Sequence, residues 1–141
     1  MMWNSICNEH DLTEFLKIYD YFHDSCLTEL RYVSGAFVSD NLAMHPVNDK
    51  RKLYVIFQRQ SKENMSVEME FSGLTKLCLN PENPMYTCEI CDISLFFENG
   101  KIYWGDSSDF ARQRENYQGT WLCADRVKWR MIDVTWSISA Q

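Results

Sequence analysis

Only one segment of this sequence has the apolar spacing of an amphipathic helix, and most of the chain after it has the spacing of short β-strands. Apolar side chains recur every three or four residues on one helical face, and they are Leu12, Phe15, Leu16, Tyr19 and Phe22. Asp11 followed by Glu14 is typical of an N-cap with its capping-box partner. The sequence therefore predicts one helix over residues 12–22 that lies on a sheet.

The chain after this helix predicts seven or eight strands joined by short turns. Residues 52–60 and 65–71 have the strongest strand patterns, and the second alternates so regularly that we expect one buried and one solvent-facing side. Asn99-Gly100 is typical of a two-residue hairpin turn. Further strands are expected within 26–39, 74–79, 85–97, 101–104 and 121–131, with a surface loop over 106–117 and an alternating tail at Val134, Trp136 and Ile138.

These strands do not alternate with helices, and the sequence contains no internal repeat. Such an order is typical of an antiparallel meander, because parallel strands need long crossover connections. We predict a mainly β fold of the α+β class: a single globular domain, residues 1–141, with the helix packed on a two-layer sandwich or a curved sheet. A closed barrel fits the strand count equally well.

Charge and hydropathy exclude several classes of protein. A formal net charge of −6 argues against nucleic-acid binding and against an anionic membrane surface, both of which need a surplus of Lys and Arg. No apolar run reaches the length of a membrane span, and the first residues lack the features of a signal peptide. We therefore expect a cytoplasmic protein whose six cysteines stay reduced.

Negative charge is concentrated near the predicted helix. Six carboxylates lie between Glu9 and Glu29, against one cation, Lys17. A solvated helix face explains this run, and so does an acidic face for a partner protein with a basic surface. On the second interpretation Glu14, Asp20 and Glu29 are candidate binding residues.

The helix pattern gives way to the strand pattern at His23-Asp24-Ser25, which makes these three residues the remaining binding candidates. Adjacent residues cannot present a nucleophile, a base and an orienting group in one line, so they are not a catalytic triad. A structural role explains them better: Asp24 or Ser25 can bond to backbone groups at the helix end, and a buried His23 can bridge helix and sheet.

Other chemically suggestive patterns also have structural explanations. Cys88 and Cys91 are spaced like half of a zinc or redox motif, but within a strand their sulfurs would diverge. Glu68 and Glu70 have the spacing of a hydrolase carboxylate pair, which is also that of any exposed strand face. The sequence contains no catalytic motif, metal-ligand set or cofactor signature, so no catalytic residue, metal or cofactor is predicted.

Three short elements carry a resemblance to a known group of proteins. These are Phe22-His23-Asp24-Ser25, Phe71-Ser72-Gly73-Leu74 and the segment from Phe96 to Trp104. Over about residues 20–130 the chain resembles small bacterial β-rich domains with an aromatic-His-Asp-Ser element, some of which are similar to immunity proteins of bacterial toxin systems. The resemblance implies a protein that binds and neutralises a toxin and catalyses nothing.

Two functions of different classes are consistent with the sequence. The first is a non-enzymatic protein–protein interaction, of the immunity type or similar, through an acidic face. The alternative is a small-molecule or metal-binding domain, or an enzyme, with its pocket at the helix-to-sheet junction near His23 and Asp24. Association into a homo-oligomer through the tail or an edge strand is a third option.

Overall fold

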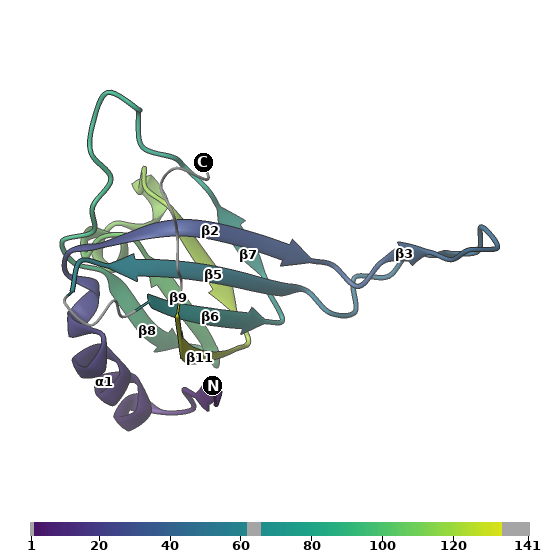
Figure 1. Ribbon diagram of the computed structural model, residues 1–141, viewed down its shortest axis with the longest axis horizontal. Helices are drawn as coiled ribbons and strands as arrows, with labels where there is room; N and C mark the ends of the chain where they lie inside the picture. The colour runs from purple at the N-terminus through teal and green to yellow at the C-terminus, as the bar shows by residue number, and fades with distance from the viewer. Residues whose placement is uncertain (1, 62–65, 134–141) are drawn as a thin grey trace.

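The computed structural model describes residues 2–61 and 66–133, and within them two antiparallel sheets form a sandwich (Figure 1). The first sheet has the order β1-β11-β6-β5-β2 and the second the order β7-β10-β9-β8. Their bounds are β1 Asn4–Ser5, β2 Ser25–Val33, β5 Lys52–Arg59, β6 Ser66–Ser72, β7 Lys76–Cys78, β8 Ser94–Glu98, β9 Lys101–Gly105, β10 Trp121–Ala124 and β11 Arg126–Ile132. The predicted α+β class and the two layers are confirmed, and the described strands do not close into a barrel.

Helix α1, Glu9–Ile18, begins earlier than predicted. Its N-cap is Asn8, whose Oδ1 accepts from the Asp11 amide at 2.9 Å, while Asp11 Oδ2 accepts from the Cys7 amide at 2.9 Å. The helix is therefore capped by Asn8, with Asp11 reaching back to the residue before the N-cap, and not by Asp11 with Glu14 as the sequence suggested. The helix ends at Ile18, and residues Asp20–Phe22 form a separate 3-10 turn, so the predicted end at residue 22 is wrong.

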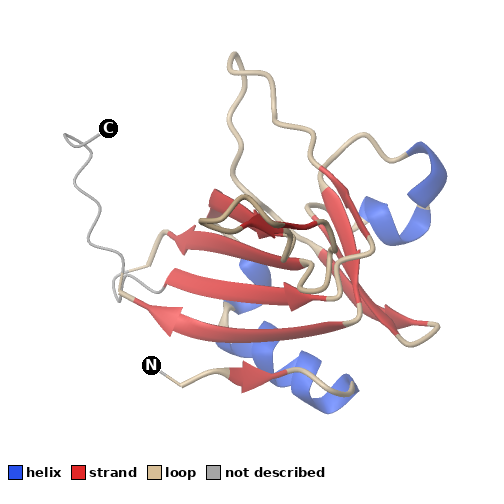
Figure 2. Ribbon diagram, turned by 90° about the vertical axis from the view of Figure 1, so that its right-hand side faces the viewer, coloured by secondary structure: helices blue, strands red, loops and turns tan. Residues whose placement is uncertain are grey.

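Aromatic side chains fill the space between the sheets and α1. Phe15 packs on Trp129 at 4.9 Å between ring centroids, and Phe22 meets Phe57 edge to face at 4.9 Å. Phe57 in turn contacts Trp104 of β9 at 5.2 Å. Figure 2 shows α1 against one side of the sandwich, opposite the loop that follows β7. The predicted apolar helix face is therefore what closes this side.

The outer face of β6 is not the solvent-facing side that its alternation predicts. Glu70 is only 4% exposed, because Lys52 and Lys128 bind its two oxygens at 3.1 and 2.9 Å and Tyr54 donates to it at 2.9 Å. Glu68 is bound by Arg130 at 2.7 Å. Both carboxylates are thus occupied by cations from neighbouring strands, and the hydrolase-like pair has no open member.

Two neighbouring strands bend from one sheet into the other. β6 leads into β7 through Gly73, and β10 leads into β11 through Asp125, where the predicted single strand over 121–131 breaks. The Asp125 amide donates to the carbonyls of Ser72 and Gly73 at 3.1 and 3.2 Å, which joins the two bends. A Cβ atom on Gly73 would lie 2.3 Å from Asp125 Oδ2, so this corner requires glycine.

The second half of the chain matches its prediction in part. The hairpin β8–β9 turns at Asn99 and Gly100 with φ values of 52° and 76°, as predicted. Residues 85–93 are a loop and not the start of a strand, with one isolated β-bridge between Ile90 and Ser25. The predicted loop over 106–117 contains a short helix α2, Asp109–Arg112, and a 3-10 turn, Arg114–Asn116. Phe110 of α2 is fully buried.

The strand alternation over 26–39 ends at Val33, and a projecting hairpin follows. Its strands are β3, Phe37–Val38, and β4, Met44–His45, which pair only with each other among the described strands. Figure 1 shows this hairpin extending away from the sandwich. The predicted tail strand at Val134, Trp136 and Ile138 lies outside the described residues, as does Met65.

Candidate functional site

At the predicted junction site, the structure has His23 and Asp24 on the surface. Both side chains are 59% exposed, and His23 Nδ1 lies 3.1 Å from Asp24 Oδ2. The expectation that a buried His23 bridges helix and sheet is therefore wrong. The two side chains contact each other, and within residues 2–61 and 66–133 neither side chain forms a hydrogen bond to another element.

Ser25 is the structural member of the predicted group. Its side chain is fully buried, and its Oγ donates to the Phe22 carbonyl at 2.5 Å, as expected for a residue that satisfies the helix end. The backbone of Asp24 anchors the junction, because its amide donates to the Ile90 carbonyl at 3.1 Å and its carbonyl accepts from Gln60 at 2.9 Å. The junction is thus held by backbone groups and one hydroxyl.

Glu14, Asp20 and Glu29 lie on three different elements. Glu14 is exposed on α1 with its nearest cation, Lys17, at 4.0 Å; Asp20 is exposed in the 3-10 turn, and Glu29 is exposed on the edge strand β2. The His23 amide donates to the Asp20 carbonyl at 3.0 Å, but within residues 2–61 and 66–133 no side-chain hydrogen bond or ion pair joins Glu14, Asp20 or Glu29 to His23 or Asp24. They stay predicted binding residues, and they are open to solvent.

The loop that follows β7, which Figure 2 shows on the side of the sandwich opposite α1, lines a cavity of about 710 Å³. Its inner end is formed by Leu27 of β2, Ile90 and Trp104 of β9, and its outer walls come from residues 79–89 and 117–120. Neither His23 nor Asp24 lines it. Ile90, which lines the cavity, exchanges backbone hydrogen bonds with Asp24 and Ser25, so the cavity adjoins the junction and extends between β2, β7 and β9.

The side chains that line the cavity carry negative charge. Glu82, Glu89 and Asp106 line it, and no Lys, Arg or His is among the described residues that do. Asp106 is held in place, since its Oδ1 accepts from the Tyr117 hydroxyl and its Oδ2 accepts from the Thr120 amide at 3.0 Å. Burial, and then the hydrogen bond to Asp106, raise the pKa of Tyr117, so this phenol stays protonated. A bond from Thr87 lowers the pKa of Glu89.

Trp104 lies at the inner end of the cavity with 1% of its surface exposed. Within the described residues, its indole Nε1 is the buried side-chain nitrogen or oxygen that has no hydrogen-bond partner. A buried donor without a partner costs about 1–3 kcal/mol, so native proteins rarely retain one without a reason. Trp104, which carries this unpartnered donor, is one of the residues that line the cavity.

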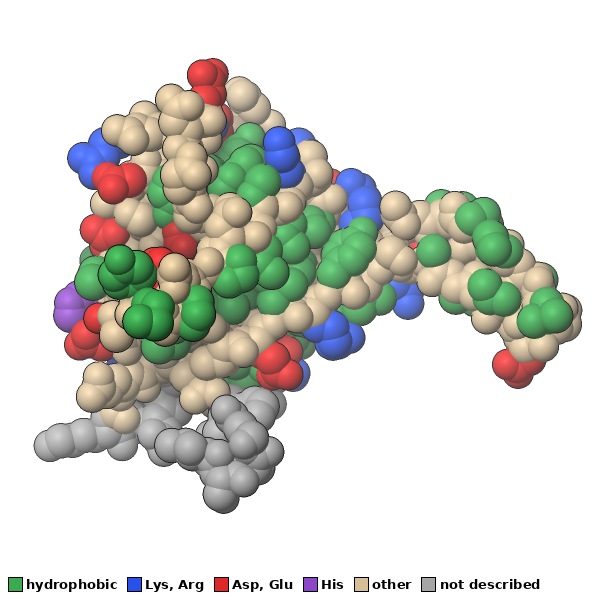
Figure 3. All heavy atoms as spheres, turned by 90° about the horizontal axis from the view of Figure 1, so that it is seen from above, with side chains coloured by type: hydrophobic (Ala, Val, Ile, Leu, Met, Phe, Trp, Pro, Cys, Tyr) green, Lys and Arg blue, Asp and Glu red, His purple; other side chains and the backbone are tan. Residues whose placement is uncertain are grey.

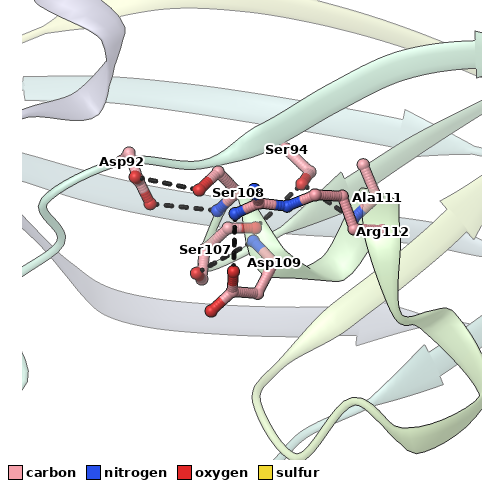
Figure 4. A network of polar contacts seen from close by, with 7 residues as sticks. All are labelled: Asp92, Ser94, Ser107, Ser108, Asp109, Ala111 and Arg112. Carbon is pink, nitrogen blue, oxygen red and sulfur yellow. Dashed lines mark hydrogen bonds and ion pairs between the residues drawn. The ribbon is translucent and has the colours of Figure 1, made fainter.

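A network of polar contacts fixes the wall that carries Ser107 (Figure 4). Asp92 accepts from the Ser108 amide at 2.9 Å and from its hydroxyl at 3.0 Å. Ser94 Oγ donates to the Ser107 carbonyl at 2.8 Å and accepts from the Ala111 amide at 3.1 Å. These bonds tie the segment before α2 to the loop that leads into β8, which makes this wall rigid.

The cysteine pattern gives no reactive site. Cys88 and Cys91 are exposed in a loop, and all six cysteines are free thiols. Burial raises the pKa of the Cys26 thiol, and the neighbouring Cys88 and Glu89 raise it further. A thiol with a raised pKa is a weak nucleophile at neutral pH. Among the described residues, no three His, Cys, Asp or Glu side chains are grouped so that they could hold a metal ion.

The projecting hairpin, residues 34–51, is here called the arm. It carries exposed apolar side chains on both strands and at its tip: Phe37 is 58% exposed, Leu42 83% and Met44 68%. Seen from above in Figure 3, hydrophobic side chains follow the arm along its length. Water-exposed apolar groups on an element that supports no core are typical of a contact surface.

Local polar bonds give the arm its shape. The amides of Lys50 and Arg51 donate to the Ser34 carbonyl at 3.0 and 3.1 Å, which closes the base. His45 Nε2 lies 3.0 Å from Asp49 Oδ2, and at the tip the Leu42 amide donates to the Ser39 carbonyl at 2.9 Å. The arm is therefore a formed hairpin that holds its apolar side chains in water.

Sequence patterns did not reveal the arm or the cavity. The sequence marks a turn at Asp40-Asn41 and a loop at His45-Pro46, but it does not show that the strands on either side of the turn leave the sandwich. The cavity combines residues from four distant segments, which no local pattern brings together. Pro81-Glu82-Asn83-Pro84 is a usable loop signal within this region.

Comparison with known proteins gives no match of any kind. No protein-family model, curated protein or solved structure matches the chain. None of the helices in the described part of the chain has the length and apolar character needed to cross a membrane.

Proposed function

We propose that this protein acts by binding another protein and that the arm is its principal contact element. The observation that carries the proposal is the exposure of Phe37, Leu42 and Met44 on a hairpin whose strands pair only with each other among the described strands. Burying such side chains in a partner would release about 25 cal/mol for each Å² of apolar surface. Aromatic and Met side chains are also enriched in protein interfaces.

The chemistry of the partner follows from the charge of the chain. A net charge of −6 and the exposed carboxylates Glu14, Asp20, Asp24 and Glu29 favour a partner with a basic surface. The resemblance to immunity-type proteins supports one form of this function, the neutralisation of a toxin. The proposal itself rests on the arm and holds for any partner protein.

The experiment compares capture by the wild-type protein with capture by the arm variant Phe37→Ser/Leu42→Ser/Met44→Ser. A matched control, Met2→Ser/Ile18→Ser/Met85→Ser, removes three apolar side chains that are exposed elsewhere. We expect a partner purified with the wild type and the control, and its loss with the arm variant. Circular dichroism checks that all three proteins are folded. Equal capture by the arm variant would refute the role of the arm.

The cavity beside Trp104 favours a second candidate function, the binding of a small ligand or side chain. Its volume of about 710 Å³ is within the range of about 300–1,000 Å³ that is usual for ligand sites. None of the described residues that line it belongs to the arm, so the two functions can be tested separately. A ligand-dependent rise in melting temperature that persists in the arm variant would support it.

A further inference from the structure

We propose that two copies of this chain pair through the outer edge of β2 and form a symmetric dimer with one continuous sheet. The inference goes beyond the proposed function, because it concerns contact between copies and does not use the arm. It rests on two observations: the length of the open edge that β2 presents, and the order of the charges along that edge.

β2 is the longest of the four edge strands in the sandwich. The strands at the ends of the two sheets are β1, β2, β7 and β8, and they have 2, 9, 3 and 5 residues. Natural proteins usually keep exposed edges short, because the free amides and carbonyls of an edge strand pair with other strands. An edge of 9 residues without a proline is therefore available for pairing with a further strand.

The start of β2 shows that its outer edge accepts a strand partner. An isolated antiparallel bridge joins Ser25 to Ile90, and the Ile90 amide donates to the Ser25 carbonyl at 2.7 Å. Beyond this bridge, β2 pairs with β5 on its other side and with no further strand among the described ones. Four of the residues in this open part are exposed, and they are Thr28, Glu29, Arg31 and Tyr32.

Glu29 and Arg31 carry opposite charges on the same face of this open edge. The Arg31 guanidinium lies over the Tyr54 ring, 4.4 Å from its centroid, on the outer face of the first sheet. Glu29 is two residues earlier, and the register of β2 with β5 is regular between the two, so Glu29 points to the same face. Within residues 2–61 and 66–133 neither side chain has an ion-pair partner.

The order of these charges makes the edge complementary to itself in one register. Directly opposite residues of antiparallel strands share a face, so with a two-fold axis beside Leu30, Glu29 of each copy lies opposite Arg31 of the other. With the axis beside Glu29 or beside Arg31, two identical charges lie directly opposite each other, which is unfavourable. A self-complementary patch is what a two-fold interface requires.

The dimer has a consequence for the arm. β2 leads directly into the arm, which Figure 1 shows continuing from the far end of the strand. Antiparallel pairing therefore sends the two arms out at opposite ends of the shared sheet. A partner with two binding sites could contact both arms at once, which raises the overall affinity without any new kind of contact.

Sedimentation velocity over the micromolar range measures the dissociation constant of the dimer with the full chain. We expect a monomer–dimer equilibrium that weakens as salt is added, because the contact includes charge pairs. Glu29→Arg and Arg31→Glu should each weaken the dimer about tenfold, since either change puts like charges opposite each other in both pairs. The double variant Glu29→Arg/Arg31→Glu exchanges the two charges and should restore the wild-type constant.

A matched control separates this effect from a change in net charge. Glu115→Arg, on the exposed turn Arg114–Asn116, changes the charge by the same amount as Glu29→Arg and should leave the dimer unchanged. Circular dichroism checks that every variant is folded. A wild type that stays monomeric throughout this range overturns the inference, and so does a dimer that neither single reversal weakens. A double variant as weak as the single ones overturns the register and the inference with it.

Hydrogen exchange locates the contact and separates it from the arm. Amides of residues 29–33 should exchange more slowly at concentrations where the dimer forms than where the monomer dominates. The arm variant Phe37→Ser/Leu42→Ser/Met44→Ser should form the dimer as the wild type does. Loss of the dimer in the arm variant would show a contact through the arm, and it would overturn pairing through β2 while the proposed function of the arm still stands.

Discussion

Glu70 should contribute more to the stability of this fold than any other carboxylate on its sheet face. We expect Glu70→Gln to lower the free energy of unfolding by about 2 kcal/mol at neutral pH. The glutamine oxygen can still accept from Tyr54 and Lys52, but its amide nitrogen faces Lys128, which donated to Glu70 at 2.9 Å. A bond to a charged group is worth about 1.5–3 kcal/mol, and the partial exposure of Lys128 reduces this.

The pH dependence gives a second test of the same contact. Burial alone would raise the pKa of Glu70, but hydrogen bonds from Lys128, Lys52 and Tyr54 outweigh it and leave the pKa below its ordinary value of 4.5. The unfolded chain therefore takes up a proton at higher pH than the folded protein does. The stabilisation by Glu70 is complete above pH 4.5 and is lost as the pH falls through the folded-state pKa.

Urea unfolding followed by tryptophan fluorescence measures both effects. The difference between wild type and Glu70→Gln should be constant from neutral pH to about pH 5 and should shrink towards pH 3. Other carboxylates titrate in both proteins and cancel. Glu14→Gln, on the exposed face of α1, is the control and should change stability by less than about 0.5 kcal/mol. A variant as stable as the wild type at neutral pH, with no change on acidification, would refute this account of Glu70.

Five further substitutions test the packing and the junction by the same unfolding assay, and each cost is a decrease in the free energy of unfolding. Gly105→Ala should cost about 2 kcal/mol, because its Cβ would lie 2.5 Å from the Phe110 ring; a cost near zero would contradict this packing. Phe22→Ala should lower the free energy of unfolding by about 4 kcal/mol, because Phe22 is buried, and exposed His23→Ala by less than about 0.5 kcal/mol. Similar losses for both variants would contradict the burial of Phe22 and the exposure of His23. Tyr21→Val should cost about 1 kcal/mol, because Tyr21 is left-handed with φ 54°, whereas Tyr21→Gly should be close to neutral.

Much of the fold was predictable because period-two alternation directly encodes which face of a strand is buried. β5 and the Asn99-Gly100 hairpin follow the sequence closely, and so do the bounds of β6, although its outer face is covered by cationic side chains. The N-cap was displaced because Asn8 with Asp11 and Asp11 with Glu14 both satisfy the capping-box pattern. The bend at Asp125 was missed because residues on both sides have strand-like character, and only the bonds to Ser72 and Gly73 show the break.

The candidate sites were less predictable than the fold. The junction turns through positive φ values at Asp20, Tyr21 and Phe22, which no composition rule anticipates for non-glycine residues. That turn sends Phe22 into the core and leaves His23 in water, the reverse of the expected burial of His23. The cavity and the buried Trp104 N–H depend on segments far apart in sequence, so single-segment patterns could not reveal them.

The pairing of β1 with β11 sets the order in which the chain can fold. Asn4 of β1 lies opposite Trp129, and Ser66 of β6 lies opposite Ile132. Both β1 and β6 therefore pair with β11, the last described strand in chain order. During synthesis on the ribosome, neither strand can complete its ladder until β11 has emerged. Contacts so distant in sequence close slowly, on the millisecond-to-second scale typical of β-sandwiches. Until then β6 presents an open edge of backbone groups, which is the kind of surface that pairs with strands of other chains.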